Sequence, residues 1–99
     1  MIIYIGKEAV CGVQLTIDRV WRYAMTSEDT LTVKVSDSEG GVISLDLKKA
    51  AQDPEDKFVT VTFPPALTSQ LAQGKGLLTA YLNELVVVPP QKIMIKGAI

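Results

Sequence analysis

The side chains that most often carry out catalysis are sparse in this sequence of 99 residues. It has no histidine, so the commonest general base and metal ligand, and the usual partner of a serine or cysteine nucleophile, are missing. Its one cysteine, Cys11, has no basic cluster nearby in sequence to lower its pKa. Free cysteine is often buried, which favours an inert Cys11 at the start of a strand. The sequence therefore predicts a protein that is not an enzyme and uses no cofactor.

Two further patterns could bind an ion or a phosphate. Acidic residues gather in two short segments, Glu28-Asp29 and Asp53, Glu55, Asp56. A calcium loop needs several oxygen ligands at set spacings, and a glycosidase needs a facing pair of carboxylates, whereas acids in a hydrophilic turn are usually solvated. Gly74-Lys75-Gly76 lacks the Ser or Thr that follows the lysine of a phosphate loop. We interpret these glycines as the end of a helix and predict no metal site.

The sequence offers two candidate contact surfaces. The first is a run that places the only tryptophan beside two arginines and a tyrosine, namely Arg19, Trp21, Arg22 and Tyr23. These residue types are enriched in binding hot spots, but Trp21 could equally close one end of the core beneath the arginine stems. The second surface is the outward side of a predicted strand, where Leu77, Thr79 and Tyr81 could be covered by a neighbouring subunit. The sequence alone does not decide whether Trp21 lies in the core or on a contact surface, or whether the outward side of the predicted strand is covered by a neighbouring subunit.

Composition and charge argue against two classes of binding partner, nucleic acid and membrane. The net charge is −1 and the basic residues are scattered, so no basic patch for nucleic acid is predicted. No apolar run approaches the ~20 residues of a membrane-spanning helix, and Lys7 and Glu8 interrupt the apolar start before it could serve as a signal peptide. The lone cysteine fits a reducing compartment. We therefore expect synthesis in the cytoplasm, with protein as the partner and neither nucleic acid nor membrane.

Alternation of apolar and polar residues with a period of two is the main structural signal, and it indicates strands. The expected strands and their inward side chains are 30–36 (Leu31, Val33, Val35), 42–47 (Ile43, Leu45, Leu47), 58–63 (Val59, Val61, Phe63), 77–84 (Leu78, Ala80, Leu82) and 92–96 (Ile93, Ile95), with Val13, Leu15 and Ile17 alternating upstream. Residues 37–41 contain acidic residues and two glycines, which predict a hairpin turn between the strands expected at 30–36 and 42–47.

The connections carry turn and helix signals. Residues 48–56 form a polar link with at most one helical turn. After Pro64-Pro65, Leu67 and Leu71 are four residues apart, which predicts a short helix near residues 65–73 that ends at Gly74 and Gly76. Lys92 and Lys96 flank the last strand and are expected to protect a sheet edge.

Strands of this length separated by turns predict one domain over residues 1–99. The expected architecture is all-β, with two antiparallel sheets packed face to face in a β-sandwich of about six to eight strands. Hydrophobic residues make up 47% of the chain, enough for one core.

From Thr30 onward the order of strands and turns resembles the immunoglobulin-like N-terminal domain of phage upper-baseplate and tail-fibre proteins. In that family a strand of alternating valines, here Val59 and Val61, leads to a turn and then to a strand with an aromatic residue. The matching positions after the valines are Thr68, Leu71, Gly74 and Tyr81. The resemblance implies an immunoglobulin-like fold, incorporation into a virion or prophage particle, and packing against its own copies or a neighbouring tail protein.

Two functions follow as predictions. The first is a non-catalytic structural or assembly module of a phage or prophage tail or baseplate, acting as a homo-oligomer. The second is a ligand-binding or inhibitory β-module that uses the region of Trp21 and Tyr23 to contact a carbohydrate or a protein target.

Overall fold

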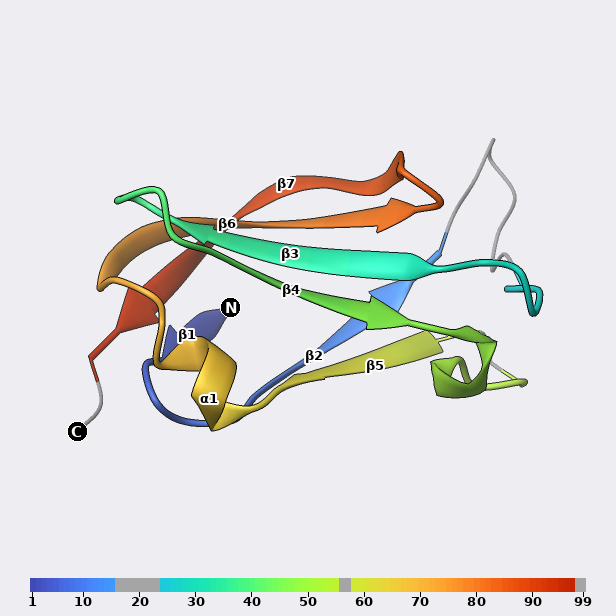
Figure 1. The fold of residues 1–99 in the computed structure, drawn as a ribbon, viewed down its shortest axis with the longest axis horizontal. Coiled ribbons are helices and arrows are strands. Elements are labelled where there is room, and N and C mark those ends of the chain that lie inside the picture. Colours follow the sequence, from blue (N-terminus) through green and yellow to red (C-terminus); the bar gives the residue numbers. More distant parts are fainter. Residues whose placement is uncertain (16–23, 56–57, 98–99) are drawn as a thin grey trace.

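The chain folds into two facing β-sheets with very little helix (Figure 1). The computed structural model describes residues 1–15, 24–55 and 58–97. In chain order the elements are β1 (Ile2–Tyr4), β2 (Ala9–Gln14), β3 (Leu31–Asp37), β4 (Val42–Leu47), the 3₁₀ turn η1 (Lys49–Ala51), β5 (Phe58–Phe63), α1 (Pro65–Thr68), β6 (Gly74–Leu82) and β7 (Leu85–Lys96). The prediction of a mostly β chain with a short helix is confirmed.

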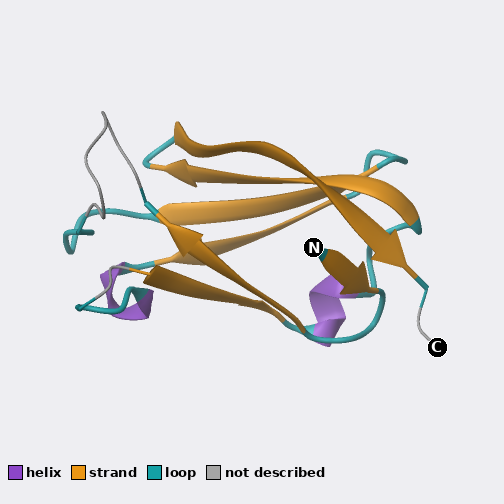
Figure 2. Ribbon diagram, turned by 180° about the vertical axis from the view of Figure 1, so that it is seen from behind, coloured by secondary structure: helices purple, strands orange, loops and turns teal. Residues whose placement is uncertain are grey.

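The larger sheet has five strands in the order β1-β7-β6-β3-β4, and the smaller sheet pairs β2 with β5. The larger sheet is curled, and the smaller sheet covers one of its faces (Figures 1 and 2). All pairs are antiparallel except β1 and β7, which run parallel. The expectation of purely antiparallel sheets is therefore wrong at this pair, because the first strand lies beside the last one instead of forming a hairpin with its neighbour in sequence.

The hairpin of β3 and β4 is confirmed, with Val33 paired to Leu45. The inward side chains of β3 are fully buried, because this strand has a neighbour on each side in the sheet. Strand β4 is an edge strand, and of its predicted inward residues only Ile43 is buried, while Leu45 and Leu47 are half-buried. The burial of an inward side chain thus depends on whether its strand is central or at an edge of the sheet, as well as on the alternation of apolar and polar residues.

One hydrophobic core lies between the two sheets. Strand β5 contributes Val59, Val61 and Phe63, all with no exposed surface, as their alternation predicts. From β2 and the residue after it come Val13 and Leu15, while Ile17 lies outside the described residues. The larger sheet contributes the buried residues Ile3, Leu31, Val33, Val35, Ile43, Leu78, Ala80, Leu82, Ile93 and Ile95.

The predicted helix near residues 65–73 is shorter than expected, since α1 ends at Thr68. Proline at its start fixes a helical φ, but the buried Thr68 hydroxyl donates a hydrogen bond to the carbonyl of Lys7 at 2.8 Å and holds the end of the helix against the β1–β2 loop. The backbone N–H of Ala72 donates to the carboxylate of Asp37 at 2.8 Å instead of to a helical carbonyl. These two tertiary bonds explain the early end.

The interpretation of Gly74 and Gly76 as the end of a helix is wrong, because both belong to β6. Gly76 pairs with Asp37 on one side and Ile93 on the other. A Cβ at this position would lie 2.7 Å from the backbone oxygen of Ser36 and 2.8 Å from Cδ1 of Ile95. Glycine is therefore needed here for close packing within the sheet.

The end of the chain contains more strand than the sequence pattern indicates. Strand β6 ends at Leu82, before a two-residue turn in which Asn83 and Glu84 have positive φ of 51° and 72°, the backbone geometry of a tight hairpin. Strand β7 then begins at Leu85, seven residues before the predicted start. It continues through Pro89 and Pro90, which fall at a register shift opposite Thr79.

The expected edge at residues 92–96 is also wrong from Met94 to Lys96, because β1 covers this part of β7. Ile2 pairs with Met94, and Tyr4 pairs with Lys96. The inward placement of Ile93 and Ile95 is confirmed. Strand β1 was not predicted, since three residues are too few to show a clear alternation.

Candidate functional site

The side of the five-stranded sheet that points away from the core is a candidate contact surface, which we call the outer face. Alternation and strand pairing place the following residues on it: Ile2 and Tyr4 (β1), Lys92, Met94 and Lys96 (β7), Lys75, Leu77, Thr79 and Tyr81 (β6), Thr32, Lys34 and Ser36 (β3), and Val42 and Asp46 (β4). The residues predicted as a contact surface, Leu77, Thr79 and Tyr81, lie in its central strand.

Large apolar side chains are exposed on this face. Ile2 is 47% exposed, Leu77 42% and Met94 41%. Pairing places Ile2 directly beside Met94, and the neighbouring strand presents Leu77 one row further along. Single exposed apolar residues are normal, but a group on one sheet face is typical of a surface that another molecule covers.

The same face is rich in lysine. Lys75 lies opposite Met94, and Lys92 lies opposite Leu77, so cationic and apolar side chains alternate across β6 and β7. Within the described part of the chain, Lys75, Lys92 and Lys96 form no ion pair. Lys34 is different, because its ammonium lies over the ring of Tyr81, 5.4 Å from the ring centre.

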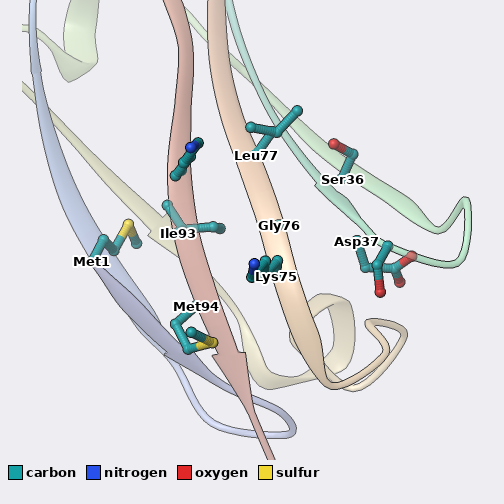
Figure 3. Close-up of a pocket in the computed structure, with 10 residues that line it drawn as sticks. Met1, Ser36, Asp37, Lys75, Gly76, Leu77, Ile93 and Met94 are labelled. Carbon is teal, nitrogen blue, oxygen red and sulfur yellow. The ribbon is translucent and has the colours of Figure 1, made fainter.

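A hollow of about 660 Å³ opens between β3, β6, β7 and the start of β1 (Figure 3). Its apolar lining includes Met1, Leu77, Ile93 and Met94, and Lys75, Lys92 and Asp37 also border it. Its volume is in the range of sites that accept a ligand or a protruding side chain. Its lining thus combines lysine ammonium groups with thioether and aliphatic side chains.

Asp37 is held by backbone amides at the end of β3. Oδ1 accepts hydrogen bonds from Glu39 N at 2.8 Å and Gly41 N at 2.7 Å, and Oδ2 accepts one from Ala72 N at 2.8 Å. These bonds, with the one from Ala72 first and the one from Gly41 next, lower the pKa of the Asp37 carboxyl below its ordinary value. The carboxylate thus links the β3–β4 turn to the segment that precedes β6.

This arrangement predicts a pH-dependent contribution to stability. Because the pKa of Asp37 is lower in the folded chain than in the unfolded chain, its stabilising contribution is fully present above the unfolded pKa of about 3.9 and is lost as the pH falls through the folded pKa. Asp37→Asn is expected to be less stable than the wild type at neutral pH, with a difference that shrinks in acid. Urea unfolding across this pH range measures it, and a difference that does not change with pH would contradict the assignment.

Cys11 lies in β2, half-buried beside a second hollow of about 480 Å³ that separates β2 from β6 and β7. Burial raises the pKa of its thiol. A raised pKa keeps the thiol protonated, and the thiolate is the nucleophilic form. This environment does not activate the sulfur.

The other sequence candidates give no site within the residues that the structure describes. Arg19, Trp21, Arg22 and Tyr23 lie outside the described residues, so the choice between core and contact surface, and the ligand-binding function tied to it, stays a prediction. Among residues 1–15, 24–55 and 58–97, no group of three or more His, Cys, Asp or Glu side chains could hold a metal ion.

Asp29, one of the clustered acids, has a structural role that the sequence did not indicate. It is only 7% exposed and accepts hydrogen bonds from Thr26 N at 2.8 Å and from the amide Nδ2 of Asn83 at 2.7 Å. It therefore joins the loop before β3 to the β6–β7 turn.

Several outer-face residues were missed at the sequence level. Ile2 and Tyr4 belong to a strand too short to recognise, and Lys75 was assigned to a helix end. Lys92 was correctly placed outward. Met94 lies two residues further along the same strand, so the same alternation could have placed it on the outer face too. Strand order, which brings β1, β6 and β7 together, has no local sequence signal.

Comparison with known proteins adds no assignment. No protein-family model matches the sequence, and no curated protein matches it. The resemblance to phage baseplate and tail-fibre domains thus stays a prediction from pattern. No helix in the described part of the chain is long and apolar enough to cross a membrane.

Proposed function

We propose that the chain is a non-catalytic assembly module that binds protein through the outer face of its five-stranded sheet. The observation that carries this proposal is the group of exposed apolar side chains, Ile2, Leu77 and Met94, on neighbouring strands of one face. Covering such a group removes apolar surface from water, which is the main favourable term in most protein association.

The proposed setting is a phage or prophage tail or baseplate, with an immunoglobulin-like sandwich as the fold. The support is the pattern from Thr30 onward, including the positions of Thr68, Leu71, Gly74 and Tyr81, together with a β-rich fold that has one small core. In this setting the chain is made in the cytoplasm and becomes part of the particle.

The test is association in solution. Size-exclusion chromatography with light scattering is run on the chain over a range of concentrations, alone and with proteins encoded beside it. Leu77→Asp is expected to weaken association about tenfold or more, because it replaces an apolar side chain of the contact with a charged group that loses its hydration there. The melting temperature should not change, since Leu77 points away from the core.

Val10→Asp is the matched control. Val10 is 56% exposed, but it lies on the outer side of the two-stranded sheet, and its replacement should leave association intact. The proposal would be overturned by a chain that stays monomeric and binds none of the neighbouring proteins. Association that Leu77→Asp leaves unchanged would also overturn it.

A further inference from the structure

The outer face is positively charged, although the chain as a whole is not. The net charge of the chain is −1. Among the described residues, alternation and strand pairing nevertheless place four lysines on this face and only one acid, Asp46. The lysines are Lys34, Lys75, Lys92 and Lys96. Positive charge is therefore concentrated on the face that also carries the exposed apolar group.

Lys75 and Lys92 are neighbours on this face and share no anion. Lys75 pairs with Met94, and Lys92 lies two residues before Met94 on β7, so the two lysines are diagonal neighbours. Side chains in this relation lie roughly 7–8 Å apart. Neither lysine forms an ion pair with any residue that the structure describes. Because like charges at this separation repel each other, an anion that contacts both ammonium groups is attracted to the site.

The acids near this face do not supply that anion. Among the described residues Asp37 is the one acid in the lining of the hollow, and its two oxygens already accept three hydrogen bonds from backbone N–H groups. Asp46 accepts a hydrogen bond from the hydroxyl of Thr32 at 2.7 Å, and the basic Lys48 follows two residues later. Glu84 belongs to the turn beyond β6. The positive charge at the hollow is thus left for another molecule to neutralise.

The surface beside the two lysines is apolar. Leu77, which is 42% exposed, pairs with Lys92 and lies two residues after Lys75 on β6. Together with Ile93 and Met94 it lines the hollow (Figure 3). The volume of about 660 Å³ is enough for a bulky side chain, and burying such a side chain favours binding.

The chemistry of the hollow favours protein over nucleic acid as its occupant. Nucleic acid is bound chiefly through the phosphates of its backbone, which have no apolar group to place against Leu77. A protein segment in which Asp or Glu lies next to a large apolar residue matches both parts of the lining. Its carboxylate can contact the ammonium groups while its apolar side chain enters the hollow.

We infer that the hollow binds an acidic segment of a partner protein, with a large apolar side chain against Leu77 and a neighbouring carboxylate between Lys75 and Lys92. This inference rests on the proposed function and specifies its partner by chemistry. Hydrogen bonds between an ammonium and a carboxylate are about twice as strong as those between neutral groups. The charges select the partner and speed its association, and the apolar contact adds affinity.

Peptide display tests this chemistry without assuming a sequence. A library of random dodecapeptides is selected for binding to the intact chain. The selected peptides are expected to be enriched in Asp and Glu next to Leu, Ile, Phe or Met. A selection that yields basic or neutral peptides, or no binder, would overturn the inference.

Charge reversal locates the binding site. Lys75→Glu/Lys92→Glu is expected to weaken binding of a selected peptide about tenfold or more, because its carboxylates then meet like charges. Fluorescence anisotropy measures the affinity at about 0.15 M salt, where exposed charges more than about 8 Å apart are largely screened. All replaced lysines, including those of the control below, are exposed, and melting temperatures verify that each variant folds.

Lys7→Glu/Lys49→Glu is the matched control for charge. It makes the same change in charge in the β1–β2 loop and in η1, and neither residue borders the hollow. Its affinity for the peptide should be close to that of the wild type. Equal losses in the two double variants would show a general effect of net charge and would rule out the assigned site.

The peptide itself provides a test of the apolar contact. Replacing its largest apolar residue by serine is expected to weaken binding about tenfold or more, since burial of a large apolar side chain contributes about 1.5–3 kcal/mol. Unchanged affinity would show that charge alone holds the peptide and would contradict the inference. A single-stranded oligonucleotide that displaces the peptide at the same concentration as unlabelled peptide would likewise contradict the choice of protein.

The outcomes separate this inference from the proposed function. If the full chain associates with itself or with a neighbouring protein in a way that Leu77→Asp abolishes and Lys75→Glu/Lys92→Glu leaves intact, the acidic segment is overturned and the assembly role stands. If association is insensitive to Leu77→Asp while a selected acidic peptide still needs Lys75 and Lys92, the assembly role is overturned and the peptide site stands. Loss of association in both variants, but not in the lysine control, supports both.

Discussion

Phe63→Ala is expected to lower the free energy of unfolding by about 3–5 kcal/mol, the usual cost of removing a buried phenylalanine. Phe63 has no exposed surface and lies on β5 in the core between the two sheets. The smaller sheet has only two strands, so few neighbours can move to fill the space left by the ring. Domains of this size have a total stability of about 5–15 kcal/mol, and the variant should therefore be partly unfolded at a modest urea concentration.

Phe58→Ala is the control for this prediction, because it makes the same chemical change on the same strand. Phe58 is 40% exposed, and its ring lies over Gly12 on the other side of the two-stranded sheet. Its replacement is expected to cost about 1 kcal/mol or less. Urea unfolding of the two variants compares them directly, and similar losses would contradict the assignment of Phe63 to the core.

Asp29→Ala is expected to lower the free energy of unfolding by about 2–3 kcal/mol, as for other buried groups whose charged partner is removed. The change leaves Thr26 N and the Asn83 amide without the carboxylate that accepts their hydrogen bonds. The Asn83 side chain also accepts a hydrogen bond from Thr30 N at 3.0 Å. Loss of Asp29 therefore loosens both the start of β3 and the β6–β7 turn.

Glu28→Ala provides the comparison for Asp29. Glu28 precedes Asp29 and is exposed, so its replacement should change stability by less than about 0.5 kcal/mol. Hydrogen exchange adds a local measurement. The backbone N–H of Asn83 donates to the carbonyl of Thr30 at 3.0 Å, and Asp29→Ala should increase the exchange rate of this N–H. Unchanged exchange at Asn83 would show that the bond to Asp29 does not hold the turn.

The central strands could be predicted from sequence because alternation is a local signal that burial enforces. Leu31, Val33 and Val35 face the core as expected, and the acids and glycines of residues 37–41 indicate the following turn. The extent of the helix could not be predicted, because it is set by bonds from Thr68 and Ala72 to residues distant in sequence.

The sequence indicates which side chains of a predicted strand lie on the candidate face, but not which strands form that face. Alternation in β6 indicates which way Leu77 and Tyr81 point, but nothing local indicates that the first strand lies beside the last. Prolines normally end a strand, and a bulge is what allows Pro89 and Pro90 to lie within β7.

The paired prolines of β7 have a consequence for how far assembly can proceed. Strand β1 borders β7 only from Met94 to Lys96, and on the remaining flank of β7 Pro89 and Pro90 have no amide hydrogen with which another chain could extend the sheet at those positions. The two prolines thus oppose the addition of a foreign strand along this part of β7, which guards one edge of the larger sheet against aggregation.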